Sequence, residues 1–164
     1  MPKTIKNIYD NSVSFENLLK AHKKARCGKR EKKKIILFEL KLEQELLELD
    51  KQLKNGRYKH GGYTKFKIYE PKERIIMASE YKDRVVHQWY VEKFIKPYFV
   101  PQFISTSYAG IEGRGMHKAS KDVQKAMRSA KSKWKNYYIL KMDVTKYFQN
   151  IDKRILWEIL KRKM

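Results

Sequence analysis

The stretch around residue 143 has the clearest capacity for chemistry in this sequence. Residues 137–142 alternate in the manner of a β-strand and lead directly to Asp143. A carboxylate at the end of a strand can hold Mg²⁺, because this hard cation prefers oxygen ligands and the strand fixes their direction. The same aspartate could instead cap the turn that follows, and spacing alone favours that simpler role.

A second candidate lies upstream, where two short alternating stretches flank a turn. Residues 63–69 and 74–77 predict two strands, and Glu70–Glu73 predicts the turn between them. The resulting β-hairpin is basic, with Lys72 and Arg74 at its tip. These two residues could bind an anion, or they could simply belong to a solvated turn.

Four sequence blocks occur in a characteristic order. They are Tyr69–Ile76 with Asp83–Gln88, then Pro97–Phe103 with Ser107–Ala109, then Gly113–Ala119, and finally Tyr137–Asp152. In this order they resemble the fingers motifs and the first palm motif of bacterial reverse transcriptases, the group II intron and diversity-generating retroelement enzymes. The resemblance covers roughly residues 60–160. Intron enzymes usually show Gly-Phe-Arg-Pro at Ala109–Glu112, so the retroelement branch is the nearer one.

The resemblance implies roles for five residues. Asp143 would be the first metal-binding carboxylate, with the backbone carbonyl of Val144 as a further ligand. Phe148 would lie against the sugar of the incoming nucleotide and select deoxynucleotides, although ordinary core packing would also explain a phenylalanine there. Lys72 and Arg74 would contact the incoming triphosphate. The complete enzyme would use two ions, Mg²⁺ or Mn²⁺, held about 3.5–4 Å apart.

The family's second catalytic motif, Tyr-x-Asp-Asp, does not occur in the 164 residues. The sequence is therefore expected to comprise the fingers and the beginning of the palm of a longer RNA-directed DNA polymerase. The rest of the palm and the thumb would then be its partners, together with dNTP. Without them, we expect the chain to be inactive as a polymerase.

The charge balance also points to nucleic acid. There are 39 Lys and Arg residues against 18 Asp and Glu, a formal net charge of +21. Basic residues exceed acidic ones in each of the regions 1–60, 61–135 and 136–164, so a folded body is expected to lie along an RNA template and a DNA or RNA primer. The charge by itself indicates nucleic acid in general, and the RNA template and the DNA or RNA primer are what the resemblance implies. The candidate nucleic-acid contacts are Lys23, Lys24, Lys29, Arg30, Lys33, Arg84, Arg114, His117 and Lys118.

The predicted fold is α+β. Apolar residues at every third or fourth position predict helices near residues 15–19, 35–53, 80–96, 116–134 and 153–160. Helical fingers with the basic hairpin would lead into the first strand and helix of a polymerase palm, an incomplete right-hand fold. The regions would be a basic helical region (1–60), the fingers (61–135) and the start of the palm (136–164). Trp89, Trp134 and Trp157 are expected in the core.

Two further hypotheses belong to other functional classes. The chain could be a non-catalytic RNA- or DNA-binding module derived from a reverse transcriptase, or a basic scaffold that contacts another protein through an unfinished sheet edge. The single cysteine, Cys27, excludes an internal disulfide. No apolar run reaches the ~18 residues of a membrane span. We therefore expect no membrane partner and a cytoplasmic location.

Overall fold

The computed structural model describes residues 8–163, so residues 1–7 of the predicted first region and residue 164 of the third lie outside the description. Its packing divides the chain into two compact units, Met1–Phe99 and Val100–Met164. Helices and one two-stranded antiparallel sheet confirm the α+β class. The three predicted regions follow motif order rather than packing, and they stay a prediction. None of the helices within residues 8–163 has the length and apolar character needed to cross a bilayer.

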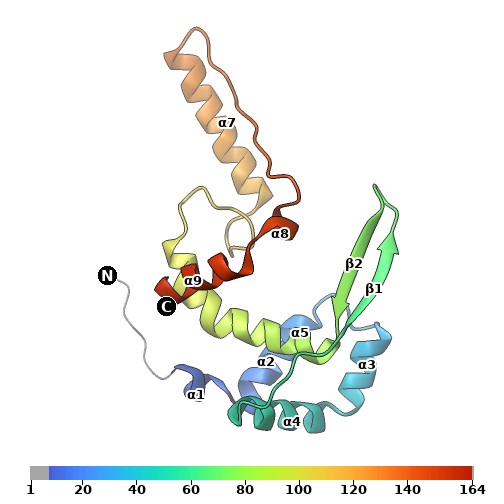
Figure 1. The fold of residues 1–164 in the computed structure, drawn as a ribbon. Coiled ribbons are helices and arrows are strands. Elements are labelled where there is room, and N and C mark those ends of the chain that lie inside the picture. The colour runs from blue at the N-terminus through green and yellow to red at the C-terminus, as the bar shows by residue number, and fades with distance from the viewer. Residues whose placement is uncertain (1–7, 164) are drawn as a thin grey trace. The chain divides into compact units, whose positions relative to one another are not determined.

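Most of the first unit is helical (Figure 1). Its helices are α1 (Ile8–Ser12), α2 (Phe15–Ala25), α3 (Lys33–Leu40), α4 (Leu42–Lys54), α5 (Tyr81–Tyr90), the π-helix η1 (Val91–Ile95) and α6 (Lys96–Phe99). Ser14 caps α2 by accepting a hydrogen bond from the Asn17 amide at 3.2 Å. Gly28 has a φ of +67° in the turn that follows α2, a backbone conformation that glycine adopts without strain.

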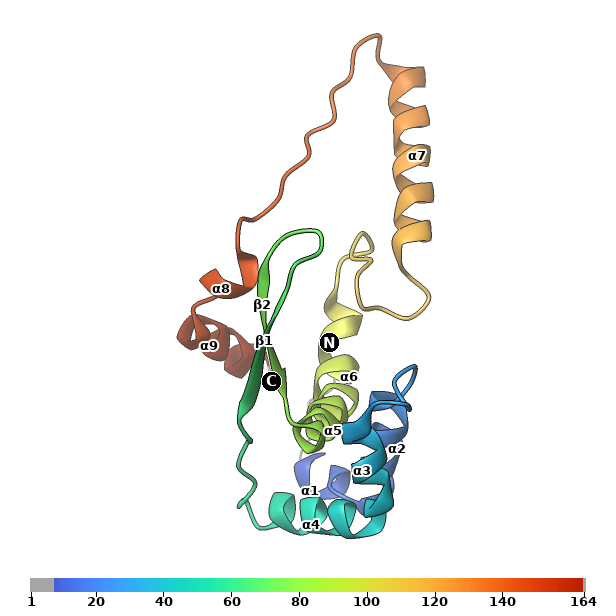
Figure 2. The ribbon, with the colours of Figure 1, turned by 90° about the vertical axis from the view of Figure 1, so that its right-hand side faces the viewer.

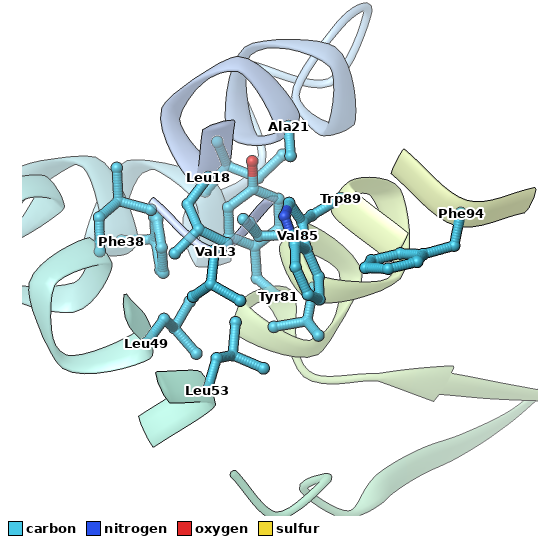
Figure 3. Packing of buried hydrophobic residues seen from close by; sticks show 13 residues of the cluster. Val13, Leu18, Ala21, Phe38, Leu49, Leu53, Tyr81, Val85, Trp89 and Phe94 are labelled. Carbon is cyan, nitrogen blue, oxygen red and sulfur yellow. The ribbon is translucent and has the colours of Figure 1, made fainter. Parts of the chain in front are cut away.

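One apolar core holds these helices together (Figure 3). Leu18 of α2, Leu46 of α4 and Val85 of α5 have no exposed surface, and each such side chain contributes about 1.5–3 kcal/mol. Trp89 is 2% exposed, and its Nε1 donates to the Ser12 carbonyl at 2.9 Å. This confirms Trp89 as a core residue. The other buried members are Val13, Ala21, Ile35, Phe38, Leu49, Leu53, Tyr81, Val86 and Phe94.

Two helices differ from the prediction, one by a break in its middle and one by its end. The expected helix over 35–53 is broken at Lys41, where φ is −122° and ψ is 29°. This break redirects the chain so that α3 and α4 both turn their apolar residues into the same core. The helix expected to end before Pro97 continues to Phe99. A π-turn precedes the proline, and Pro97 occupies the first turn of α6, where no helical N–H bond is required of it.

The predicted hairpin is confirmed. Strands β1 (Tyr63–Ile68) and β2 (Arg74–Ser79) pair antiparallel in a register that runs from Tyr63 opposite Ser79 to Ile68 opposite Arg74. Every residue of β1 is exposed, and in β2 only Ser79, at the end next to α5, is buried. Figure 2 shows the hairpin extending away from α3 and α4 of the same unit, and the residues of its turn are exposed.

Asp83 of α5 ties the chain before the hairpin to the helical core. Its fully buried carboxylate accepts hydrogen bonds from the Tyr58 hydroxyl at 2.7 Å and from the Gly61 amide at 3.1 Å. Burial and the bond to Asp83 raise the pKa of Tyr58 well above its usual range. The base of the hairpin is therefore fixed although its strands are exposed.

A second buried polar network centres on His22 of α2. Its ring is 1% exposed, stacks on Phe38 with centroids 5.5 Å apart, and lies 3.1 Å from the Tyr81 hydroxyl through Nδ1. Nε2 lies 3.2 Å from Glu39, which also accepts from Arg26. Burial lowers the pKa of His22 and outweighs the opposing pull of Glu39. The hydrogen bond from Arg26 lowers the pKa of Glu39.

The second unit begins with a short 3₁₀ helix, η2 (Val100–Gln102), followed by α7 (Met116–Lys133), α8 (Tyr147–Asn150) and α9 (Lys153–Lys163). The helix expected at 116–134 is confirmed. None of the described side chains of this unit is fully buried. Trp134 and Trp157 are 60% and 53% exposed, so their predicted core positions are wrong. Both tryptophans fit the helical spacing, but the described unit offers no core deep enough to enclose them.

The expected strand over 137–142 is also wrong. Residues 137–144 are extended but form no strand, because none of the residues described here pairs with them. A strand exists only where a neighbour accepts and donates its backbone hydrogen bonds. The predicted palm strand and its unfinished sheet edge are therefore not formed within residues 8–163.

Substitution of Gly61 tests the Asp83 anchor. A Cβ on Gly61 would lie 2.9 Å from Asp83 Oδ2, whereas a Cβ on Gly62 would meet nothing within 4 Å. The two hydrogen bonds prevent the buried carboxylate from moving aside, so we expect Gly61→Ala to lower the free energy of unfolding by about 1–3 kcal/mol. Gly62→Ala, the matched control, should change it by less than about 0.5 kcal/mol. Urea unfolding measures both, and equal effects would contradict the anchor.

The His22 network predicts a pH dependence of stability. The pKa of His22 in the folded protein lies below its ordinary value of 6.5. The contribution of His22 to the free energy of unfolding is therefore complete above pH 6.5 and declines as the pH falls through that value. His22→Gln removes this titration, so we expect a smaller loss of stability between about pH 7.5 and pH 5.5 than in the unchanged protein. Urea midpoints at the two pH values measure it, with exposed His117→Gln as control. Identical pH dependence in all three proteins would be the contrary result.

Candidate nucleic-acid interface and metal site

The hairpin tip presents two cations without carboxylate partners. Lys72 lies in the exposed turn, and Arg74 opens β2 opposite Ile68. The nearby Glu73 pairs instead with Lys67 at 2.6 Å. Within the described residues no ion pair engages Lys72 or Arg74. Their charges are therefore available to an anion such as a triphosphate, with lysine as a point charge and arginine as a planar donor.

The residues expected around the metal lie in the second unit and face solvent. Asp143 is exposed in the extended segment before α8, and Val144 is 64% exposed. The N-cap of α8 is Lys146, and within residues 8–163 no hydrogen bond ends on the Asp143 carboxylate, so the capping alternative is not observed. Asp152, by contrast, caps α9 by accepting from the amides of Arg154 and Ile155 at 2.8 and 3.3 Å.

Phe148 was open to a second interpretation, as a core residue. It is 84% exposed on α8 and contacts the Tyr147 ring at a centroid distance of 5.3 Å. The described chain therefore does not use Phe148 for core packing. An exposed aromatic ring is available to a sugar or base, which is the role implied by the resemblance.

The donors for a metal are of the right kind but few. The Asp143 carboxylate and the Val144 carbonyl supply the oxygen ligands that Mg²⁺ prefers. No group of three or more His, Cys, Asp or Glu side chains gathers anywhere within residues 8–163. The hairpin cations belong to the first unit and Asp143 to the second. Their expected convergence on one nucleotide stays a prediction.

The basic segment between α2 and α3 is largely solvent-exposed. Lys29 and Arg30 lie in the connecting turn, and Lys33 opens α3. Lys23 lies in the last turn of α2 and forms no ion pair with any described residue, whereas Lys24 is neutralised by Glu92 at 2.6 Å. Four of the five candidates in this segment are therefore free to meet phosphates, and Lys24 is already engaged.

Two arginines among the candidates hold the backbone instead of projecting into solvent. Arg84 donates through Nε and Nη2 to the Ser79 carbonyl at 3.2 and 3.1 Å, which fixes the end of β2 to α5. Arg114 donates through Nη1 to the carbonyls of Ile104 and Ser107 at 2.9 and 3.0 Å. Both are positioning residues in this structure. Direct contact of either arginine with nucleic acid stays a prediction.

His117 and Lys118 are exposed in the first turn of α7, and Lys118 lines a groove that the sequence did not predict. The groove, of about 490 Å³, lies between the loop around Ser105 and the flank of α7 around Lys125. Three cations of α7, Lys121, Lys125 and Arg128, were likewise missed. Their three- and four-residue spacing would have revealed them, but the sequence reasoning followed only the apolar positions of this helix.

Comparison with known proteins adds no family assignment. No protein-family model matches the sequence, and no curated protein matches it either. The likeness to reverse transcriptases therefore rests on the residues of the four blocks themselves.

Proposed function

We propose that this chain forms the fingers and the start of the palm of an RNA-directed DNA polymerase. The observation that carries the proposal is the exposed basic hairpin, with Lys72 and Arg74 unpaired at its tip. A hairpin of this kind, followed by a helix that begins at Tyr81, is what the resemblance to reverse transcriptases expects. Template RNA, primer and dNTP would be the ligands, and a cytoplasmic location stays part of the proposal.

In the proposed reaction, the primer 3′-hydroxyl attacks the α-phosphate of a deoxynucleotide and pyrophosphate leaves. Lys72 and Arg74 would stabilise the negative charge that accumulates on the leaving phosphates. Phe148 would exclude a ribose 2′-hydroxyl by occupying the space beside the sugar. Asp143 and the Val144 carbonyl would hold a divalent ion, which when bound activates the hydroxyl and stabilises the departing charge.

Charge supports the nucleic-acid part of this proposal independently of the motifs. A net charge of +21 makes a compact chain repel itself, and binding a polyanion relieves that repulsion. Unpaired cations occur in both units, at the hairpin tip, in the turn after α2 and along α7. Each phosphate that they neutralise releases counterions and adds affinity without regard to sequence.

A second candidate function, a non-catalytic nucleic-acid-binding module, is supported by the same charge. It requires the exposed cations of both units but no metal and no role for Asp143. The two candidates differ in the consequence of changing that carboxylate.

We expect Asp143→Asn to abolish catalysis in the product of the complete reading frame that encodes this chain. Loss of a metal ligand should lower Mg²⁺-dependent primer extension on an RNA template by about 100-fold or more, with primer binding retained. Asp152→Asn is the matched control, because an asparagine also caps a helix. Extension that survives Asp143→Asn as well as it survives Asp152→Asn would exclude the catalytic assignment.

The chain alone should bind nucleic acid with a steep salt dependence. Filter binding of single-stranded RNA across a sodium chloride series should give a line of log affinity against log salt, with a slope of about −0.7 per neutralised phosphate. A slope of about −3 or steeper is expected from the unpaired cations. A flat response, or no binding at low salt, would contradict both candidate functions.

A further inference from the structure

The cations of α7 are gathered on one side of the helix. Lys118, Lys121, Lys125 and Arg128 recur at intervals of three or four residues, and all four are exposed. At about 100° per residue they fall within an arc of about 80°, and the line from first to last is about 15 Å long. These four residues are called the basic face of α7 below.

The apolar residues of α7 lie on the opposite side. Val123 and Ala130, with Ala119, follow the same spacing but are rotated by roughly half a turn from the basic face, and Ala126 lies between the two sides, where it also lines the groove of α7. Packing through this apolar side would therefore leave all four cations facing outward. The basic face does not depend on which surface α7 packs against.

A built groove runs beside the basic face. Lys118 and Lys125 line it together with the hydroxyl-bearing side chains of Ser105, Thr106 and Ser129. Its outer wall is the loop that Arg114 fixes through the carbonyls of Ile104 and Ser107. Amines and hydroxyls in one groove are the donors with which proteins contact phosphate and sugar oxygens.

One acidic residue interrupts this surface. Asp122 lines the groove and accepts a hydrogen bond from the Tyr108 hydroxyl at 2.8 Å. That hydrogen bond raises the pKa of Tyr108 and keeps Asp122 in place. The carboxylate opposes any anion that enters the groove, so its removal should strengthen binding there.

We propose that the basic face of α7 and this groove bind the sugar–phosphate backbone of one nucleic-acid strand, without reading its bases. A line of about 15 Å matches four or five phosphates at about 3.4 Å each along a strand. This inference rests on the proposed nucleic-acid function and adds Lys121, Lys125 and Arg128 to the interface.

A basic amphipathic helix could also lie on an anionic membrane. The apolar side of α7 argues against this, because it consists of Ala119, Val123 and Ala130 with the two methionines Met116 and Met127 and with Ala126 at its border, and it carries no leucine or aromatic residue. Membrane-surface helices insert larger side chains such as Trp, Phe and Leu. Nucleic acid is therefore the ligand that the two faces fit.

The test compares two double variants of the full chain that remove the same charge from the same helix. Lys121→Gln with Lys125→Gln changes the basic face, and Lys131→Gln with Lys133→Gln changes exposed residues about 100° to either side of it. In filter binding of a uridine homopolymer, the first pair should reduce the salt slope by about 1.4. That corresponds to about 25-fold weaker binding at 0.1 M salt. The control pair should reduce the salt slope by less than half as much as the first pair does. A cytidine homopolymer should give the same result.

Asp122→Asn supplies a variant that should gain affinity, which a misfolded protein would not do. Removal of one negative charge from the groove should tighten binding of the same RNA several-fold at 0.1 M salt. Unchanged or weaker binding would count against the groove as the site.

The remaining outcomes separate the inference from the proposed function. Equal losses from the two double variants would overturn the basic face as the site while leaving nucleic-acid binding in place. No RNA binding by the unchanged chain would overturn both. If the first pair lost binding to vesicles of anionic phospholipid but kept binding to RNA, α7 would be a membrane-surface helix and the proposal would be wrong.

Discussion

The imbalance between cations and carboxylates is the constraint on which this structure depends. With 39 basic residues and 18 acidic ones, the chain cannot neutralise itself by internal pairing. Several of the acidic groups are committed to holding the fold, as Asp83 shows beside Tyr58 and Glu39 beside Arg26 and His22. Most cations within residues 8–163 therefore lie on the surface without a carboxylate partner, and a polyanionic ligand would complete the charge balance.

The two units differ in how much of their apolar surface is buried. The first unit has a continuous apolar core, and buried polar groups such as the Trp89 indole N–H bind specific neighbours, here the Ser12 carbonyl. In the second unit, α7 and α9 carry exposed apolar and basic residues together, and α8 exposes the aromatic rings of Tyr147 and Phe148. The first unit can therefore hold the hairpin base rigidly, whereas the second presents long surfaces suited to contact with a ligand or with further protein.

Local patterns were predicted well from sequence and non-local ones were not. The hairpin was found because its two strands are neighbours in the chain and its turn is short, and α7 was found from its helical spacing. The strand expected at 137–142 required a distant partner, which alternation alone cannot supply. The predicted core position of Trp89 is confirmed, whereas the one predicted for Trp134 from the same helical spacing is wrong. Spacing does not say whether a surface exists against which the residue can pack. At the candidate site, the exposure of Lys72 and Arg74 was expected, whereas the backbone-holding role of Arg114 depends on a loop whose path the sequence does not specify.

The proposed polymerase function assigns separate roles to the exposed basic hairpin of the first unit and to the exposed Asp143 carboxylate and Phe148 ring of the second. Its central claim is that these parts serve template-directed synthesis of DNA. The most direct measurement supplies labelled deoxynucleotides or ribonucleotides, with Mg²⁺ and a primed RNA template, to the product of the complete reading frame. The account predicts addition of deoxynucleotides in the order that the template specifies, with ribonucleotides strongly disfavoured. Addition without regard to the template, or none in the presence of primer binding, would contradict it.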